Sequence, residues 1–230
     1  MERIGGSMRS EVTRARHRAL GHIVAIKRLL PHAQEAPEER QRFIEECALM
    51  LDRCHPGLVT GLERLHGPQG PEDLCLVMPF IEGAPMSALM THERIPPEDA
   101  IAHAGFTLAS ALSGLHTAGG GALVHGDISA RNVLIDAAGT LSVIDLSSAG
   151  PHGAMPRDAG TPRYRAPERQ LGAPLTTQGD VYALGVLLWE LSAGRRWPAE
   201  TPTQLPDSSP LAGSALEALI MRCIASTPEE

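Results

Sequence analysis

Two short stretches near the start of the chain have the hydrophobic pattern of β-strands. Residues 22–29 (HIVAIKRL) alternate between apolar and polar side chains, as a half-buried strand does. Residues 74–78 (LCLVM) form an apolar run of strand length. The pattern predicts that the first third of the chain is rich in β-structure.

Residues 37–54 (PEERQRFIEECALMLDRC) have the pattern of an amphipathic helix between these strands. Pro37 followed by two glutamates is typical of a helix N-terminus, and apolar residues recur at helical spacing around Cys47. At about 100° per residue, Glu45 lies opposite this apolar stripe, whereas Glu46 lies to its side. We therefore expect Glu46 to point inward and Glu45 to face water.

The rest of the chain has the pattern of helices around a β-hairpin. Residues 98–116 carry apolar side chains on one face, and residues 180–191 are apolar nearly all round, as in a buried helix. Between them, NVLID (132–136) and LSVID (141–145) have the length of short strands and are joined by the turn AAGT. The whole pattern predicts an α+β fold.

Composition and charge are those of an ordinary globular protein. The chain has 230 residues, of which 43% are hydrophobic, enough for one large domain or two small lobes. The net charge of −7 and the pI near 5.8 argue against nucleic acid as a partner. Arginine is concentrated only in residues 3–18.

Cysteine spacing predicts neither a zinc site nor disulfide bonds. No CxxC pair occurs among the four cysteines, which are Cys47, Cys54, Cys75 and Cys223. Reduced thiols are typical of a cytoplasmic protein. The longest apolar run, residues 181–189, is far shorter than the ~20 residues of a membrane span, and residues 1–20 lack the apolar segment of a signal peptide.

Residues 125–150 (HGDISARNVLIDAAGTLSVIDLSSAG) contain the most informative polar side chains. Asp127 is followed five residues later by Asn132 and thirteen residues after that by Asp145. Because the hairpin returns the chain, we expect Asn132 and Asp145 to face one cleft. Carboxylate and amide oxygens bind Mg²⁺, which usually shares its shell with phosphate. Asn132 and Asp145 are therefore a candidate magnesium site.

These motifs together resemble those of the protein kinases of the eukaryotic type, which include bacterial Ser/Thr kinases. The matching segments, in chain order, are VAIK ending at Lys27, HGD ending at Asp127, Asn132, DLS starting at Asp145, GTPRYRAPE (160–168) and GDVYALGVLLWEL (179–191). The resemblance implies a bilobal fold in a single domain over residues 1–230. It divides this domain into a small β-rich N-lobe with one main helix (1–78), a hinge (79–82) and a larger, mostly α-helical C-lobe (83–230).

The resemblance also implies ATP and Mg²⁺ as cofactors and assigns roles to individual residues. Catalytic roles belong to Asp127, Arg131, Lys27 and Glu46. Asn132 and Asp145 would hold Mg²⁺. Contacts to ATP belong to Gly5, Ser7, Ser10, Val12, Ala25, Lys27, Met78, Pro79, Ile81 and Leu134. Lys27 is the only lysine beside 19 arginines, and its compact ammonium fits next to Glu46 where a guanidinium is too bulky.

Several positions depart from the family pattern. The glycine loop contains Gly5, Ser7 and Ser10, and a serine that must adopt φ > 0 would cost about 1 kcal/mol. Gly126 replaces the arginine that in many kinases receives an activation-loop phosphate, and residues 149–160 contain no Ser, Thr or Tyr. We therefore expect either constitutive geometry or control by a regulatory protein partner.

Two further departures concern the metal-binding motif and the C-terminal end. Leu146 and Ser147 replace the last two residues of DFG, and the serine is expected to restrict flipping of that segment. Family members usually continue with an arginine that pairs with the glutamate of APE, here Glu168. In a C-lobe truncated at its C-terminal end, this carboxylate would be buried without a partner. Either the chain is a fragment, or another arginine such as Arg222 substitutes, or the C-lobe is weakened.

The function implied by the resemblance is ATP-dependent phosphoryl transfer to Ser/Thr hydroxyls of protein substrates. Thr161 and Tyr164 in GTPRYRAPE favour Ser/Thr over tyrosine substrates. Two alternatives stay open. One is a pseudokinase that binds or scaffolds, which the eroded glycine loop favours. The other is a small-molecule phosphotransferase, because HGD followed by Asn132 also resembles the antibiotic and choline kinase group.

Overall fold

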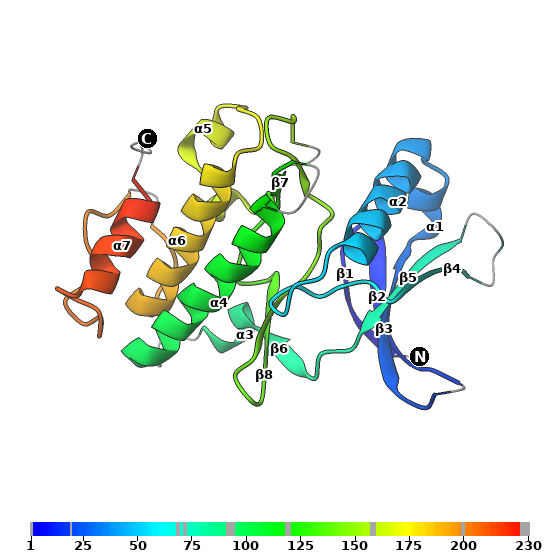
Figure 1. Cartoon of the computed structure of the whole chain (residues 1–230), viewed down its shortest axis with the longest axis horizontal. Helices are drawn as coiled ribbons and strands as arrows, with labels where there is room; N and C mark the ends of the chain where they lie inside the picture. The colour runs from blue at the N-terminus through cyan, green and yellow to red at the C-terminus, as the bar shows by residue number, and fades with distance from the viewer. Residues whose placement is uncertain are drawn as a thin grey trace. The chain divides into compact units, whose positions relative to one another are not determined.

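The structure is a computed structural model, which describes residues 2–18, 20–67, 70, 73–90, 95–117, 121–156, 160–198 and 201–225. The chain divides into two units, Met1–Glu82 and Gly83–Glu230, which are coloured blue to cyan and green to red in Figure 1. Each unit has its own buried core. Residues 226–230, after which the family pattern has the arginine that pairs with the glutamate of APE, lie outside the described residues.

The first unit is built on a five-stranded antiparallel sheet. Its strands are β1 (Glu2–Gly6), β2 (Ser10–Arg16), β3 (Ile23–Leu29), β4 (Glu63–His66) and β5 (Leu74–Pro79). The strand order is β1-β2-β3-β5-β4. The strands predicted at residues 22–29 and 74–78 are confirmed as β3 and β5, which pair with each other through Lys27 opposite Leu76.

Two helices follow β3 in this unit, α1 (Pro31–Gln34) and α2 (Pro37–Asp52). The predicted helix is confirmed as α2, with proline in its first turn followed by Glu38 and Glu39. Acidic residues are favourable there because the helix dipole is positive at its N-terminus. The buried face of α2 carries Phe43, Glu46, Cys47 and Met50, as the helical phase predicts.

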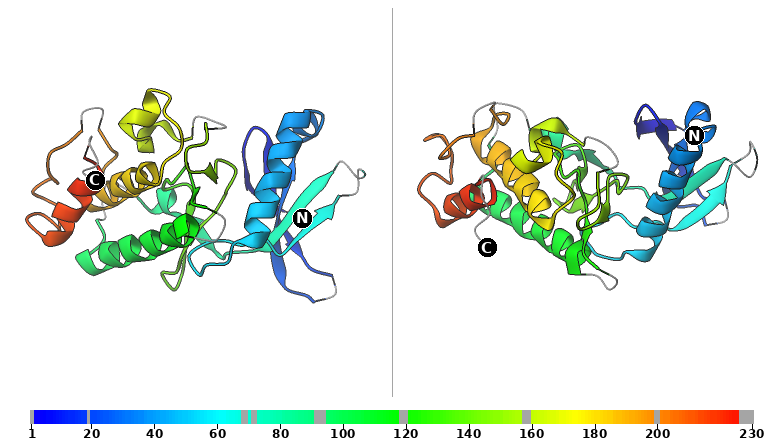
Figure 2. Two further views of the ribbon diagram at one scale, coloured as in Figure 1. Left: turned by 45° about the horizontal axis from the view of Figure 1, so that its top comes forward. Right: turned by 90° about the horizontal axis from the view of Figure 1, so that it is seen from above.

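The second unit is mostly helical. Its longer helices are α4 (Glu98–Thr117), α6 (Thr177–Ala193) and α7 (Ala215–Cys223). Its short helical segments are α3 (Met86–Leu89), η1 (Pro162–Tyr164) and α5 (Pro167–Gln170). Helix α6 packs between α4 and α7, as Figure 1 shows, and Figure 2 gives two further views of these helices. No helix in the described part of the chain is long and apolar enough to span a membrane.

Helix α6 is the centre of the second core. Every residue from Tyr182 to Ala193 is buried, and Trp189 is fully so. The helix starts where the Thr176 hydroxyl accepts the Gly179 N–H at 3.0 Å, and it ends at Gly194, whose φ of 61° is a left-handed cap. These signals fix the ends of a helix whose all-round apolar sequence does not define a single face.

Two small antiparallel sheets lie next to these helices. One contains β6 (Gly83–Pro85), β8 (Val133–Asp136) and β9 (Leu141–Val143), and the other pairs β7 (Leu123–Val124) with β10 (Gly150–Pro151). Strands β8 and β9 confirm the predicted hairpin. The Asp136 carboxylate closes its turn by accepting the N–H groups of Ala138 and Thr140 at 2.9 and 2.8 Å.

Candidate active site

A buried aspartate at the start of α6 fixes the loop that follows β7. Asp180 is 1% exposed, and its carboxylate accepts the backbone N–H groups of His125 and Gly126 at 2.7 and 2.9 Å. His116, near the end of α4, lies 2.9 Å from the same carboxylate through Nε2. Backbone donors held by a buried acceptor position the loop with little freedom. The following residue, Asp127, is thereby placed at a defined point.

Asp127 is held on both of its carboxylate oxygens. Oδ1 accepts the N–H of Thr161 at 2.6 Å, and Oδ2 accepts Nδ2 of Asn132 at 2.9 Å. Burial raises the pKa of Asp127 above its ordinary value, although the bonds from Thr161 and Asn132 oppose this rise. A carboxylate with a raised pKa is a stronger base than a free aspartate. Asp127 therefore has the position and the basicity of a proton acceptor.

Asn132 and Asp145 flank the β8–β9 hairpin, and the carbonyl of Asn132 accepts the N–H of Ile144 at 2.8 Å. Nδ2 of Asn132 donates to both the carbonyl and the carboxylate of Asp127, so the amide oxygen is the atom left for a cation. Asp145 is the only described non-glycine residue with positive φ, at 70°. An amide oxygen and a carboxylate fit the ligand preference of Mg²⁺.

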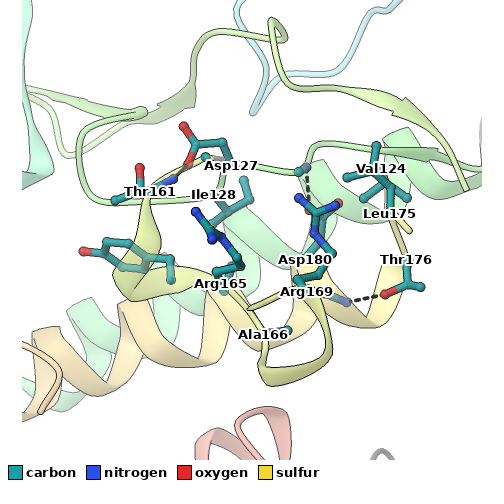
Figure 3. Close-up of a pocket in the computed structure, with 15 residues that line it drawn as sticks. Val124, Asp127, Ile128, Thr161, Arg165, Ala166, Arg169, Leu175, Thr176 and Asp180 are labelled. Carbon is teal, nitrogen blue, oxygen red and sulfur yellow. Dashed lines mark hydrogen bonds between the residues drawn. The ribbon is translucent and has the colours of Figure 1, made fainter. Parts of the chain in front are cut away.

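Gly126 lies in a narrow pocket beside Asp127 and Asp180. The pocket is drawn in Figure 3, where Arg165 and Arg169 are among the labelled lining residues. Gly126 has a φ of 78°, and a Cβ added there would lie 2.8 Å from the carbonyl oxygen of Ser148. Glycine replaces the family's arginine at position 126, and the backbone there has a conformation that disfavours any side chain. Sequence reasoning did not identify Arg165 or Arg169, although GTPRYRAPE already contained the first of them.

In the first unit, Lys27 and Glu46 form a buried ion pair. Nζ of Lys27 lies 2.5 Å from Oε1 of Glu46, and the two residues are 7% and 3% exposed. Glu45 instead accepts a bond from Gln41 at the surface. The inward direction of Glu46, predicted from helical phase, is confirmed.

Four predicted contacts for ATP meet on three neighbouring strands of the first sheet. Val12 lies opposite Lys27 on β2 and β3, and Ala25 lies opposite Met78 on β3 and β5. The hinge residues Pro79 and Ile81 follow at the end of β5 and are partly exposed. Leu134 is in the second unit, on β8, and is partly exposed too. Within the first unit, strand pairing therefore explains how Val12, Ala25, Lys27 and Met78 come together although they are far apart in the sequence.

The turn after β1 contains Gly5, Ser7 and Ser10. The Ser7 hydroxyl accepts the N–H groups of Arg9 and Ser10, each at 3.1 Å, and Ser7 N–H donates to the Ser10 carbonyl at 2.7 Å. Neither serine has positive φ, so the conformational penalty considered for them does not arise. The serines instead close the turn with side-chain bonds, as short polar residues commonly do.

The structure corrects the expectation for Glu168. This residue, on α5, is only partly buried. No ion pair between Glu168 and Arg222 occurs in the part of the chain that the structure describes. The large penalty of an unpaired charge applies to a fully buried carboxylate. The expectation of a fully buried, unpaired carboxylate at Glu168 is therefore wrong.

A second buried carboxylate, Glu190 on α6, was missed by sequence reasoning. It is 2% exposed and accepts bonds from the Tyr164 hydroxyl, from Trp197 N–H at 2.7 Å and from Arg163 Nη1 at 3.4 Å. Burial and the bond to Glu190 raise the pKa of Tyr164, so the phenol remains a donor. This network ties the 160–168 segment to α6. The one sign of this network in the sequence is a glutamate within the apolar helix VYALGVLLWEL.

The chain is similar to known proteins over most of its length. Residues 1–209 match the family model described as "Protein kinase domain". The chain is 32% identical over 199 residues to the DNA damage-responsive serine/threonine-protein kinase RqkA of Deinococcus radiodurans, which covers 83% of this chain and 28% of that protein. It is 32% identical over 180 residues to the serine/threonine-protein kinase PknA of Corynebacterium glutamicum, covering 75% of this chain and 38% of that protein. The chain therefore spans well under half the length of these relatives.

A solved structure shares the fold. The kinase domain of Mycobacterium tuberculosis PknI, determined as a point mutant, matches with a TM-score of 0.73 at 23% identity, over 99% of this chain and 86% of that one. The predicted fold class, a β-rich lobe with one main helix followed by a mostly α-helical lobe, is confirmed by this match.

Proposed function

The chain belongs to the protein kinase domain family, and from this premise we propose that it transfers the γ-phosphoryl group of ATP to serine and threonine hydroxyls of protein substrates. The relatives compared above are both named as serine/threonine-protein kinases. These relatives are much longer than this chain, so we propose their activity for this chain and do not take it from their names alone.

The geometry of Asp127 carries the proposal. A substrate hydroxyl must be oriented and must lose its proton as the phosphorus–oxygen bond forms, and a fixed carboxylate within hydrogen-bonding reach does both. Asp127 is oriented by Thr161 and Asn132, and burial raises its pKa. It can therefore accept the proton of a bound Ser or Thr hydroxyl while remaining in place.

The other candidate residues supply charge and position. Lys27, kept in place by Glu46, would bind phosphate oxygens of ATP, and Arg131 would stabilise charge on the transferred group. Asn132 and Asp145 would hold Mg²⁺, which when bound neutralises phosphate charge. The contacts to the nucleotide proposed for Gly5, Ser7, Ser10, Val12, Ala25, Met78, Pro79, Ile81 and Leu134 follow from the same family pattern.

We further propose that transfer does not depend on phosphorylation of the 149–160 segment. Gly126 leaves no side chain to receive a phosphate, and a Cβ there would meet the Ser148 carbonyl. Control would then belong to a protein partner or be absent. The four free thiols are consistent with a cytoplasmic location.

The test is phosphoryl transfer from labelled Mg·ATP to the chain itself and to generic Ser/Thr peptides. We expect Asp127→Asn to lower the rate roughly 10² to 10⁴-fold, since general-base catalysis contributes about that much. Asp145→Ala should also abolish transfer. Asp207→Asn is the matched control, because Asp207 is an exposed aspartate of the same unit. Phosphatase treatment should leave the parent rate unchanged.

Absence of transfer from a folded parent chain would contradict the proposal and favour a binding or scaffold module. Equal rates in Asp127→Asn and Asp207→Asn would also contradict it, because the proton acceptor would then lie elsewhere.

A further inference from the structure

A cavity of about 660 Å³ opens in the second unit beside the loop that carries Asp127. Thr161, whose N–H donates to Asp127, is one of its lining residues, and Arg131, four residues after Asp127, is another. Its apolar lining includes Met86, Ile101 and Leu141. A protein segment bound in this cavity would therefore lie next to the proposed proton acceptor.

The cavity is strongly basic. Four arginines line it, Arg131, Arg163, Arg195 and Arg196, whereas Glu190 is the only carboxylate among the lining residues that the structure describes. The formal charge of these five side chains is +3, from four positive and one negative, in a chain whose net charge is −7. Such a local excess attracts negative groups even when the whole molecule is acidic.

Glu190 does not offer its charge to a ligand. The Tyr164 hydroxyl, the Trp197 N–H and Arg163 already bind it, and it is 2% exposed. Arg131 and Arg196, in contrast, are exposed and form no ion pair with any carboxylate among the residues the structure describes. Arg195 is exposed too, and its guanidinium lies 5.5 Å from the centre of the Trp189 ring.

We propose that this cavity binds acidic side chains of the protein substrate, aspartate or glutamate residues close to the Ser or Thr that is phosphorylated. This inference rests on the proposed function, because it assumes that the bound segment belongs to a phosphorylated substrate. Binding of the segment can nevertheless be measured without phosphoryl transfer. Guanidinium groups bind carboxylates through paired N–H donors, which gives direction as well as attraction. The apolar lining would contact the methylene groups of the same segment.

The test uses three fluorescent peptides that share a central serine and differ in flanking residues, which are acidic, neutral or basic. Binding is measured by fluorescence anisotropy at low and at high salt, and phosphoryl transfer is measured in parallel. Each exposed arginine–carboxylate contact is worth about threefold in affinity, so the acidic peptide should bind roughly tenfold more tightly than the neutral one at low salt. High salt should remove most of this preference.

Charge-neutral variants locate the effect. Arg196→Gln should reduce the preference for the acidic peptide about threefold, and the double variant Arg195→Gln/Arg196→Gln should remove most of it. Arg222→Gln is the matched control, because Arg222 is an exposed arginine of α7 that does not line the cavity. A preference for neutral or basic peptides, or an acidic preference unchanged in the double variant, would overturn the proposal.

The two proposals fail in different ways. Tight binding of the acidic peptide without any transfer would support the acidic docking site and contradict the kinase activity. Transfer that prefers neutral or basic peptides would support the kinase activity and contradict the acidic docking site.

Discussion

Gly126 shows at the residue scale how one position combines two constraints. Its φ of 78° is strained for any L-residue with a side chain, and a Cβ would also meet the Ser148 carbonyl at 2.8 Å. Gly172 has a φ of 88° but nothing within 4 Å of a Cβ. Comparing Gly126 with Gly172 therefore separates the cost of backbone strain from the cost of steric contact.

We expect Gly172→Ala to lower the free energy of unfolding by about 1 kcal/mol through strain alone. Gly126→Ala should lose roughly 1–3 kcal/mol more, because the carbonyl of Ser148 must move. Urea unfolding followed by tryptophan fluorescence measures both, since Trp189 and Trp197 are in the same unit as the two glycines. Similar losses in the two variants would show that the contact at Gly126 is relieved at no cost.

Residue-scale prediction from sequence succeeded where a local rule decides the outcome. The inward direction of Glu46 follows from helical phase, which depends only on α2 itself. The burial of Glu168 was predicted wrongly because it depends on what covers α5, which no local pattern records. The interactions of Glu190 depend on Tyr164, Arg163 and Trp197 converging in space, which the sequence pattern does not record.

At the scale of elements, α2 is tied to the sheet of its own unit through the Lys27–Glu46 pair. We expect Glu46→Gln to lower the free energy of unfolding by roughly 3 kcal/mol, because it leaves the Lys27 ammonium buried without its carboxylate. Glu45→Gln, one residue away on the surface side of the helix, should change it by less than about 0.5 kcal/mol. Urea titration by circular dichroism, with hydrogen exchange at β3, distinguishes the two.

An equal loss in both variants would indicate that the helix itself, rather than the ion pair, was weakened. Faster exchange at β3 only in Glu46→Gln would place the effect at the contact between α2 and the sheet.

Elements with strong periodicity and the β8–β9 hairpin were predicted, whereas strand β4 and the short helical segments were not. Helices α2, α4 and α6, strands β3 and β5 and the β8–β9 hairpin follow patterns that local physics determines. Strand β4 (ERLH) is exposed at every residue, so it has no alternation to detect and exists through its pairing with β5. Helical segments of four residues, such as α3 and α5, depend on tertiary contacts.

At the scale of the whole molecule, family resemblance supplied what periodicity could not. Local pattern predicted a β-rich part and a helical part, whereas the bilobal fold came from the ordered motifs and is confirmed by the PknI match. The basic cavity was not predicted, because Arg131, Arg163 and Arg196 come from three separate segments and only the tertiary fold brings them together.

The single lysine makes nucleotide binding measurable on the intact chain. An acyl-phosphate derivative of ATP transfers its acyl group to a lysine amine next to the bound phosphates, and Lys27 is the only lysine in 230 residues. If Lys27 contacts ATP phosphates as proposed, intact mass should show one added label, which excess ATP prevents. Lys27→Arg keeps the positive charge but lacks the amine, so it should show no ATP-competed label.

A parent chain that gains no competed label would contradict the assignment of Lys27. If that chain still transferred phosphate, ATP would bind without this contact; if it did not, the kinase fold would serve binding alone.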